Sequence, residues 1–219
     1  NKDQPERKLF QRRLFWGKDL GVFIVSSETA TANHKSYGIE EFLYNANGRA
    51  RVKPNSGKEQ IFSAGDFFVV PKGFNGEWET QGGTLYHYEL SVITTKRSPK
   101  GSFGKSLLPY SIDKAKLSGI GLTKVKSANG KEFYRDELFK GIELSIHLEA
   151  EEGQTRKVDP TKGDQLVYVI AGTVKISGES LATQTFYTGD FFILPRGFTG
   201  NWVTKGHHLF RTLRVTKSS

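Results

Sequence analysis

The sequence predicts an all-β protein made of two tandem antiparallel sandwiches or barrels that are related by an internal repeat. Residues 65–80 return as residues 189–204 at an offset of 124, and ten of the sixteen positions are identical. Each copy opens with Gly-Asp, continues with four apolar residues and closes in a Pro-x-Gly turn, which is typical of a short strand between turns. Residues 142–149 alternate between apolar and polar side chains, and no segment keeps a helical period over about 12 residues.

The length of the chain and its linker-like composition near the middle predict the domain boundaries. At 219 residues it accommodates two domains of roughly 100 residues each. We expect an N-terminal arm plus the first domain over residues 1–95, a linker rich in Ser, Gly, Pro and Lys over 96–106, and the second domain over 107–219.

In the first half, residues 1–20 are polar and basic but contain Leu, Phe and Trp, which predicts an arm packed against another surface. A polar loop is expected over residues 26–36. Strands are expected, in order, at residues 21–25, 41–48, 49–53, 61–62, 67–70 and 84–94.

The second half begins with residues 107–122, which mix apolar and polar side chains and predict one short helical turn around 112–117. The second repeat then runs from about residue 132 to 215. Its strand at 142–149 has the alternation expected of a strand with one buried face.

Composition limits the functional classes. The chain has no Cys, which excludes disulfides, thiol catalysis and Cys-ligated zinc. It lacks a run of about 20 apolar residues, so we expect a soluble chain with no transmembrane segment. Because it also lacks Met, processing of its start is expected, and export after removal of a signal peptide stays open. The net charge of +9 suits an anionic partner or, alternatively, only a solvated surface with a basic arm, and no nucleic-acid motif accompanies it. We predict a small-molecule ligand and no nucleic acid.

Two spaced motifs in each half resemble those of cupin domains, the small jelly-roll barrels (double-stranded β-helices) of the RmlC-like type. The resemblance implies a bicupin, and the Pro-x-Gly-Phe-x-Gly-x-Trp ending is most similar to the subgroup of ureidoglycine aminohydrolase-type and ethanolamine-utilisation-type domains. The first motif is Glu41 and Gly48, with Gln165 and Gly172 in the second half; the other is Gly65, Pro71 and Gly73, with Gly189, Pro195 and Gly197.

Cupin enzymes usually hold Mn, Fe, Ni or Zn with three His and one Glu, and carrying these positions over leaves a degenerate metal site. In the first half only His34 and Glu41 are retained, because Ser36 and Gly76 replace the other two ligands. In the second half none is retained, since the Glu position is Gln165 and the others hold Asp159 to Lys162 and Gly200. If a divalent metal is bound at all, the resemblance leaves one rearranged set in the first half: His34, Glu41, Glu77 and His87.

Other interior positions point to a small ligand. Strand alternation places Glu41 on the face that is the barrel interior in cupins, where a carboxylate needs a metal, Arg or Lys as partner. His147 shares a polar strand face with Glu143, Ser145 and Glu149; we expect this face to be exposed, and the alternative is that it turns inward beside Gln165. Arg211 falls on His87 at the repeat offset, which would give the second cavity a cation. The candidate ligand-binding residues are therefore Glu41, His34, His87, Gln165, Arg211 and His147.

Three functions follow from these observations. The first is a bicupin that binds a small anionic metabolite and whose metal site has degenerated. The second, by resemblance, is a metal-dependent aminohydrolase-like enzyme with its site in the first half. The third is an interaction protein, such as a homodimer, that assembles through its aromatic arm.

Overall fold

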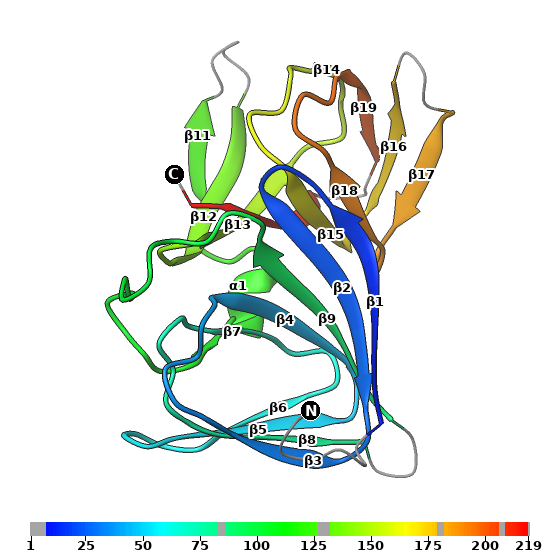
Figure 1. Ribbon diagram of the computed structural model, residues 1–219. Helices are drawn as coiled ribbons and strands as arrows, with labels where there is room; N and C mark the ends of the chain where they lie inside the picture. Colours follow the sequence, from blue (N-terminus) through cyan, green and yellow to red (C-terminus); the bar gives the residue numbers. More distant parts are fainter. Residues whose placement is uncertain (1–7, 83–85, 127–131, 179–181, 206–208, 219) are drawn as a thin grey trace. The chain divides into compact units, whose positions relative to one another are not determined.

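The computed structural model describes residues 8–82, 86–126, 132–178, 182–205 and 209–218, and these residues are almost wholly β-strand (Figure 1). Their one helix is the single turn α1 (Lys114–Leu117), at the place where the sequence predicted a helical turn. The Asp113 side chain caps it by accepting a hydrogen bond from the backbone N–H of Ala115. No helix within the described ranges has the length and hydropathy to cross a bilayer. The predicted all-β class is confirmed.

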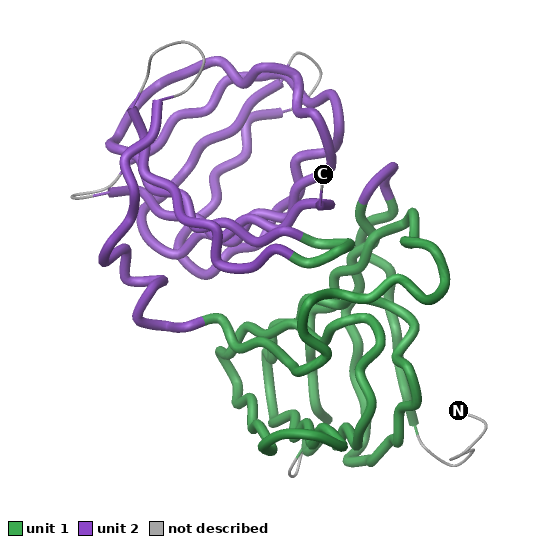
Figure 2. Tube along the Cα trace, turned by 90° about the vertical axis from the view of Figure 1, so that its left-hand side faces the viewer, with its two compact units in different colours: residues 1–16, 20–112, 141–144 green, residues 17–19, 113–140, 145–219 purple. Residues whose placement is uncertain are grey.

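The chain forms two compact units, which are coloured separately in Figure 2. Unit 1 comprises Asn1–Trp16, Leu20–Ile112 and Gly141–Leu144. Unit 2 comprises Gly17–Asp19, Asp113–Lys140 and Ser145–Ser219. Each unit therefore includes one short segment that is distant in sequence from the rest of that unit.

Unit 1 is a barrel of two antiparallel sheets. The six-stranded sheet contains, in spatial order, β1 (Leu9–Trp16), β2 (Leu20–Ser27), β9 (His87–Thr94), β4 (Glu41–Asn47), β7 (Phe67–Val70) and β10 (Tyr110–Ser111). The four-stranded sheet contains β3 (Ala30–His34), β8 (Gly76–Gln81), β5 (Arg49–Pro54) and β6 (Gln60–Ser63).

Unit 2 repeats this topology. Its six-stranded sheet has the order β11 (Thr123–Lys126), β12 (Glu132–Lys140), β13 (Leu144–Glu151), β20 (Phe210–Lys217), β15 (Gln165–Ala171) and β18 (Phe191–Leu194). Its four-stranded sheet has the order β14 (Thr155–Val158), β19 (Gly200–Lys205), β16 (Thr173–Ser177) and β17 (Gln184–Tyr187). Five strands of the six-stranded sheet and all four strands of the other sheet follow the same order in both units, while β10 and β11 extend the six-stranded sheets at opposite edges. The shared order is that of the jelly roll, and the predicted tandem repeat is confirmed.

The loop predicted over residues 26–36 is wrong in part, because it contains the strand β3. This strand pairs with β8 from Ala30 opposite Thr80 to His34 opposite Gly76. The sequence Ala-Thr-Ala-Asn-His contains no large apolar side chain, so pairing with a distant strand rather than a local hydrophobic pattern makes it extended. The expected start of the closing strand at Thr84 lies outside the described residues.

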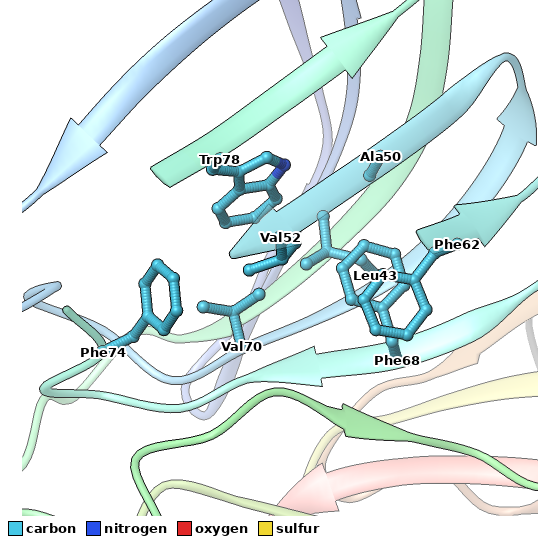
Figure 3. Close-up of a cluster of buried hydrophobic side chains, with 8 residues drawn as sticks. All are labelled: Leu43, Ala50, Val52, Phe62, Phe68, Val70, Phe74 and Trp78. Atoms are coloured by element: carbon cyan, nitrogen blue, oxygen red, sulfur yellow. The ribbon is translucent and has the colours of Figure 1, made fainter. Parts of the chain in front are cut away.

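The two hydrophobic cores occupy equivalent positions of the repeat. In unit 1 the rings of Phe62 and Phe68 stack with centroids 4.0 Å apart, beside Trp78 (Figure 3). The full cluster is Leu43, Ala50, Val52, Phe62, Phe68, Val70, Phe74 and Trp78. Adding 124 to each number gives residues in or against the core of unit 2, namely Val167, Val174, Ile176, Phe186, Phe192, Leu194, Phe198 and Trp202. One pattern of apolar positions thus specifies both barrels.

In unit 2, two acids and one base hold the short segment Gly17–Asp19 in place. The Asp19 backbone N–H donates to Asp164 Oδ2 at 2.7 Å, and the Asp164 backbone N–H donates to Asp19 Oδ2 at 3.2 Å. Arg196 donates to the same Asp19 carboxylate from Nε at 3.0 Å and from Nη2 at 2.7 Å. These bonds from Arg196 lower the pKa of Asp19, although burial acts in the opposite direction.

In unit 1, the repeat-equivalent residues hold Gly141–Leu144 in the same way. Adding 124 to Asp19, Glu40 and Lys72 gives Glu143, Asp164 and Arg196. The Glu40 backbone N–H donates to Glu143 Oε2 at 3.3 Å, the Glu143 backbone N–H donates to Glu40 Oε1 at 3.1 Å, and Lys72 Nζ lies 3.5 Å from Glu143 Oε1. We call each of these sets of two acids and one base a clasp. A Cβ at Gly141 would collide with the Glu40 carboxylate, so this clasp requires glycine there.

Candidate functional site

The interior of unit 1 holds a buried carboxylate. Glu41 lies on the same face of β4 as the core residue Leu43, as the alternation predicted, and is 8% exposed. Its carboxylate accepts hydrogen bonds from the hydroxyl groups of Tyr37, at 2.5 Å, and of Ser91. The partners are therefore two hydroxyls and not the expected metal, Arg or Lys. Burial, followed by the charge of Glu89, raises the pKa of Glu41 from 4.5 to about 7.

A second pair lies on β9 in the same interior. His87 is fully buried, and its Nε2 lies 2.9 Å from Glu89 Oε2. Two buried atoms nearby have no hydrogen-bond partner among the described residues: Nδ1 of His87 and Oδ1 of Asn45. The interior of unit 1 is thus acidic, and its polar groups mostly bind one another.

Of the four residues of the rearranged metal set, Glu77 points away from the interior that holds Glu41 and His87. Glu77 points to the other face of β8 from Trp78 and forms an ion pair with Arg51 at 2.5 Å. The ring of His34 packs edge-on against Tyr37, with centroids 4.9 Å apart, and burial lowers its pKa. Within the described ranges, no group of three or more His, Asp or Glu side chains is placed to hold a metal ion.

In unit 2, the polar face of β13 turns into the barrel, so the expected exposure of this face is wrong. Ser145 and His147 are 6% and 9% exposed, and Glu151 accepts a 2.6 Å hydrogen bond from Nε1 of the core residue Trp202. Charged partners make this possible, because Glu149 pairs with Arg214 at 2.8 Å and Glu151 with Arg156 at 3.4 Å. Alternation alone did not distinguish a face against solvent from a face against other polar side chains.

The closing strand of unit 2 is shifted by one residue relative to the repeat offset. In unit 1, Leu43 lies opposite Ser91, whereas the equivalent Val167 lies opposite Arg214, an offset of 123. The interior cation is therefore Arg214. Arg211 takes the place of Tyr88 and not of His87, and it donates to the backbone carbonyl of Leu117 at 3.3 Å. A one-residue shift moves a side chain to the other face of the sheet.

Two guanidinium groups cover the ring of Trp202 in this interior. The Cζ atoms of Arg156 and Arg214 lie 5.0 Å and 5.3 Å from its centroid. Arg214 also donates from Nη1 to Gln165 Oε1 at 3.0 Å. These groups line a pocket of about 320 Å³ together with Lys162.

A larger pocket of about 710 Å³ adjoins it, and both are lined by Lys162 and Gln165. His147 and Gln165, two of the candidate ligand-binding residues, lie together in its wall. The basic side chains that line the two pockets are Arg135, Lys140, Arg156, Lys162, Arg196, Arg214 and Lys217. Four acidic side chains, Asp19, Glu137, Asp159 and Asp164, line them as well. Across the described part of the chain, Lys140, Lys162 and Lys217 have no ion-pair partner, so the lining has an excess of positive charge.

Unit 1 has aromatic rings at the equivalent positions of the repeat. Trp16, which is 50% exposed, and Phe23 pack edge-on with centroids 6.0 Å apart, and a Cβ at Gly21 would lie 2.8 Å from the Trp16 ring. At the repeat offset, Trp16 corresponds to Lys140 and Phe23 to His147. The pocket wall of unit 2 thus has Lys and His where unit 1 has this aromatic pair, which we call the plug, and the sequence signal was the replacement of two apolar repeat positions by Lys and His.

A family model for the EutQ-like cupin domain matches the sequence twice, over residues 21–88 and 139–211. The chain belongs to the EutQ-like cupin family. A search of curated proteins gives no match.

Solved cupin structures share the fold along nearly the whole chain. A protein of unknown function from Pseudomonas syringae pv. tomato superposes with a TM-score of 0.76 at 19% identity, over 94% of this chain and 85% of that one. A cupin 2 conserved barrel domain protein from Leptotrichia buccalis gives 0.64 at 14% identity, over 96% and 89%. A variant of oxalate decarboxylase from Bacillus subtilis gives 0.52 at 11% identity, over 97% and 74%. At these identities the likeness shows a bicupin fold alone.

The residues that this cupin has at the family's usual ligand positions, and Glu77 of the rearranged set, do not fit a divalent metal. In unit 1, Glu41 is satisfied by two hydroxyls and Glu77 is held by Arg51. In unit 2, the Glu position is Gln165, whose oxygen accepts from Arg214. A guanidinium at that distance repels a cation.

Proposed function

We propose that this bicupin binds a small anionic metabolite, with a carboxylate or similar group, in the mouth of the unit 2 barrel. The observation that carries the proposal is the contrast between the repeats. Where unit 1 has the plug Trp16 and Phe23, unit 2 has Lys140 and His147 in the wall of a pocket of about 710 Å³. A pocket of this size and polar lining suits a metabolite-sized ligand.

The charges of the pocket favour an anion. Arg214 and Gln165 are fixed by hydrogen bonds and are preorganised at the boundary of the two pockets, while Lys162 reaches both with a free ammonium group. Lys140 and Lys217 line the larger pocket as well, so a bound anion would be surrounded by cations from several elements of unit 2.

The alternative, a metal-dependent aminohydrolase-like enzyme in unit 1, would require His34, Glu41, Glu77 and His87 to converge. Glu77 is held by Arg51 on the other face of β8, and Glu41 and His87 are bound to other side chains, which favours binding in unit 2 over metal chemistry in unit 1.

Calorimetric titration with sulfate and malonate at low, constant ionic strength tests the proposal. Lys162→Met is expected to weaken binding about fivefold, corresponding to about 1 kcal/mol for one partly exposed charge. Lys58→Met, an exposed lysine of unit 1, makes the same change in net charge and is the control. Malonamide, the neutral analogue of malonate, should not bind.

A second variant tests the location. Lys140→Trp with His147→Phe places the plug of unit 1 in unit 2 and should abolish binding while the protein stays folded by circular dichroism. Failure of both anions to bind, or unchanged binding in this double variant, would refute the proposed function.

A further inference from the structure

His147 is a buried titratable side chain in the wall of the unit 2 pocket. It is 9% exposed. Its Nδ1 is buried without a partner, and neither ring nitrogen has a hydrogen bond to a described residue. Because Nε2 is not among the buried atoms that lack a partner, it is the nitrogen that a ligand in the pocket can reach.

We propose that His147 contacts the bound anion and that the pocket takes up this anion together with one proton. The inference rests on the proposed function, and it adds both a binding residue and a dependence on pH.

The surroundings of His147 supply the physical reason. Arg135 and Glu137 face it from β12, Glu149 lies beside it on β13, and Arg214 reaches it from β20. Asp19, Asp164 and Arg196 of the clasp and the lysines Lys140, Lys162 and Lys217 complete the charged lining. Burial, followed by the charge of Arg135, lowers the pKa of His147.

An anion at Nε2 would provide the counter-charge that the free pocket lacks. The pKa of His147 would then be higher with the anion bound than without it, so binding takes up a proton at a pH between the two values. Affinity accordingly rises as the pH falls through the bound pKa and becomes constant below the free pKa. The maximal gain is about tenfold for each unit by which the anion raises the pKa.

Sulfate is the probe, because its own charge stays constant between about pH 5 and pH 8, the range in which imidazole titrates. Proton NMR of the five histidines, recorded against pH with and without saturating sulfate, gives the pKa of His147 in both states. The imidazole signal that is absent from the spectrum of His147→Gln is the signal of His147. We expect a pKa below the ordinary 6.5 in the free protein and an increase on binding. His34, in unit 1, should not respond.

The affinity of the wild type for sulfate should rise at least severalfold from about pH 8 to pH 5, whereas that of His147→Gln should be weaker and flatter. Binding with no change in the pKa of His147, or with the same pH profile in His147→Gln, would overturn this inference and leave the proposed function intact. Failure of sulfate to bind at any pH would overturn this inference, and failure of malonate as well would refute the proposed function.

Discussion

Replacing Glu143 by Gln tests the clasp of unit 1. The carboxylate accepts hydrogen bonds from the Ser98 backbone N–H at 2.9 Å, the Ser98 hydroxyl at 2.6 Å and the Thr94 hydroxyl at 3.3 Å, besides its contact with Lys72. Its side chain is 1% exposed, and that of Lys72 is 7% exposed. The amide keeps the shape but leaves the ammonium group of Lys72 buried without a counter-charge.

Removing one partner of a buried ion pair costs about 3–5 kcal/mol. For a chain of this length, such a loss lowers the melting temperature by roughly 6–20 °C. Burial alone would raise the pKa of Glu143, but its hydrogen bonds, chiefly from Ser98, lower it below the ordinary range. The stabilisation is therefore present above the unfolded pKa and is lost as the pH falls through the folded pKa. The wild type and Glu143→Gln should converge in acid.

Urea unfolding followed by circular dichroism measures the loss, and the other clasp gives a matched comparison. Asp19→Asn changes the equivalent acid of the unit 2 clasp. The basic partner there, Arg196, is 44% exposed, so water can solvate its guanidinium group once the carboxylate is removed, and the loss of unfolding free energy should be smaller. Adding Lys72→Met to Glu143→Gln should regain part of the stability, because it removes the buried ammonium group that Glu143→Gln leaves without a counter-charge. Equal losses in the two single variants, or an unchanged Glu143→Gln, would refute this reasoning.

Two further predictions concern stability. The folded pKa of Glu41, about 7, lies above its ordinary value of 4.5. The protonated side chain therefore contributes its full stabilisation below about pH 4.5, and the free energy of unfolding falls by about 3 kcal/mol as the pH rises through 7. Glu41→Gln should remove this decline, which urea titrations at about pH 5 and pH 8 measure. Both Pro-x-Gly turns hold their glycine at positive φ, +91° at Gly73 and +80° at Gly197, so Ala should cost about 1–2 kcal/mol at either. Gly73→Ala should lose more, because its Cβ would collide with the Phe103 ring whereas Gly197 has open space; equal melting temperatures would contradict this.

The sequence predicted the fold well because the features that determine it are local or repeated. The Gly-Asp-Phe-Phe stretch, the Pro-x-Gly turns and the alternating strands recur at one offset, and the cores match position by position. β3 was missed because its pairing with β8 is not encoded in its own pattern. The short segments that each unit takes from elsewhere in the chain depend on contacts between Asp19 and Arg196 and between Glu143 and Lys72, which are far apart in sequence.

The candidate site was predicted only in part. Inward orientation of Glu41 followed from alternation, and His147 and Gln165 do meet in one pocket. The sequence placed Arg211 in the interior because a fixed offset of 124 was applied across a closing strand in which the offset is 123. Arg214, whose role depends on that register, was not detected for the same reason.

The stacked Phe pairs have a consequence for how the two halves diverged. Phe62 with Phe68 and Phe186 with Phe192 preserve the same packing, while Trp16 and Phe23 of unit 1 correspond to Lys140 and His147 of unit 2. A duplicated gene could therefore exchange Trp for Lys and Phe for His at one mouth, one codon at a time, without losing the folded state. The residues that differ in this way between the two halves lie outside both hydrophobic core clusters.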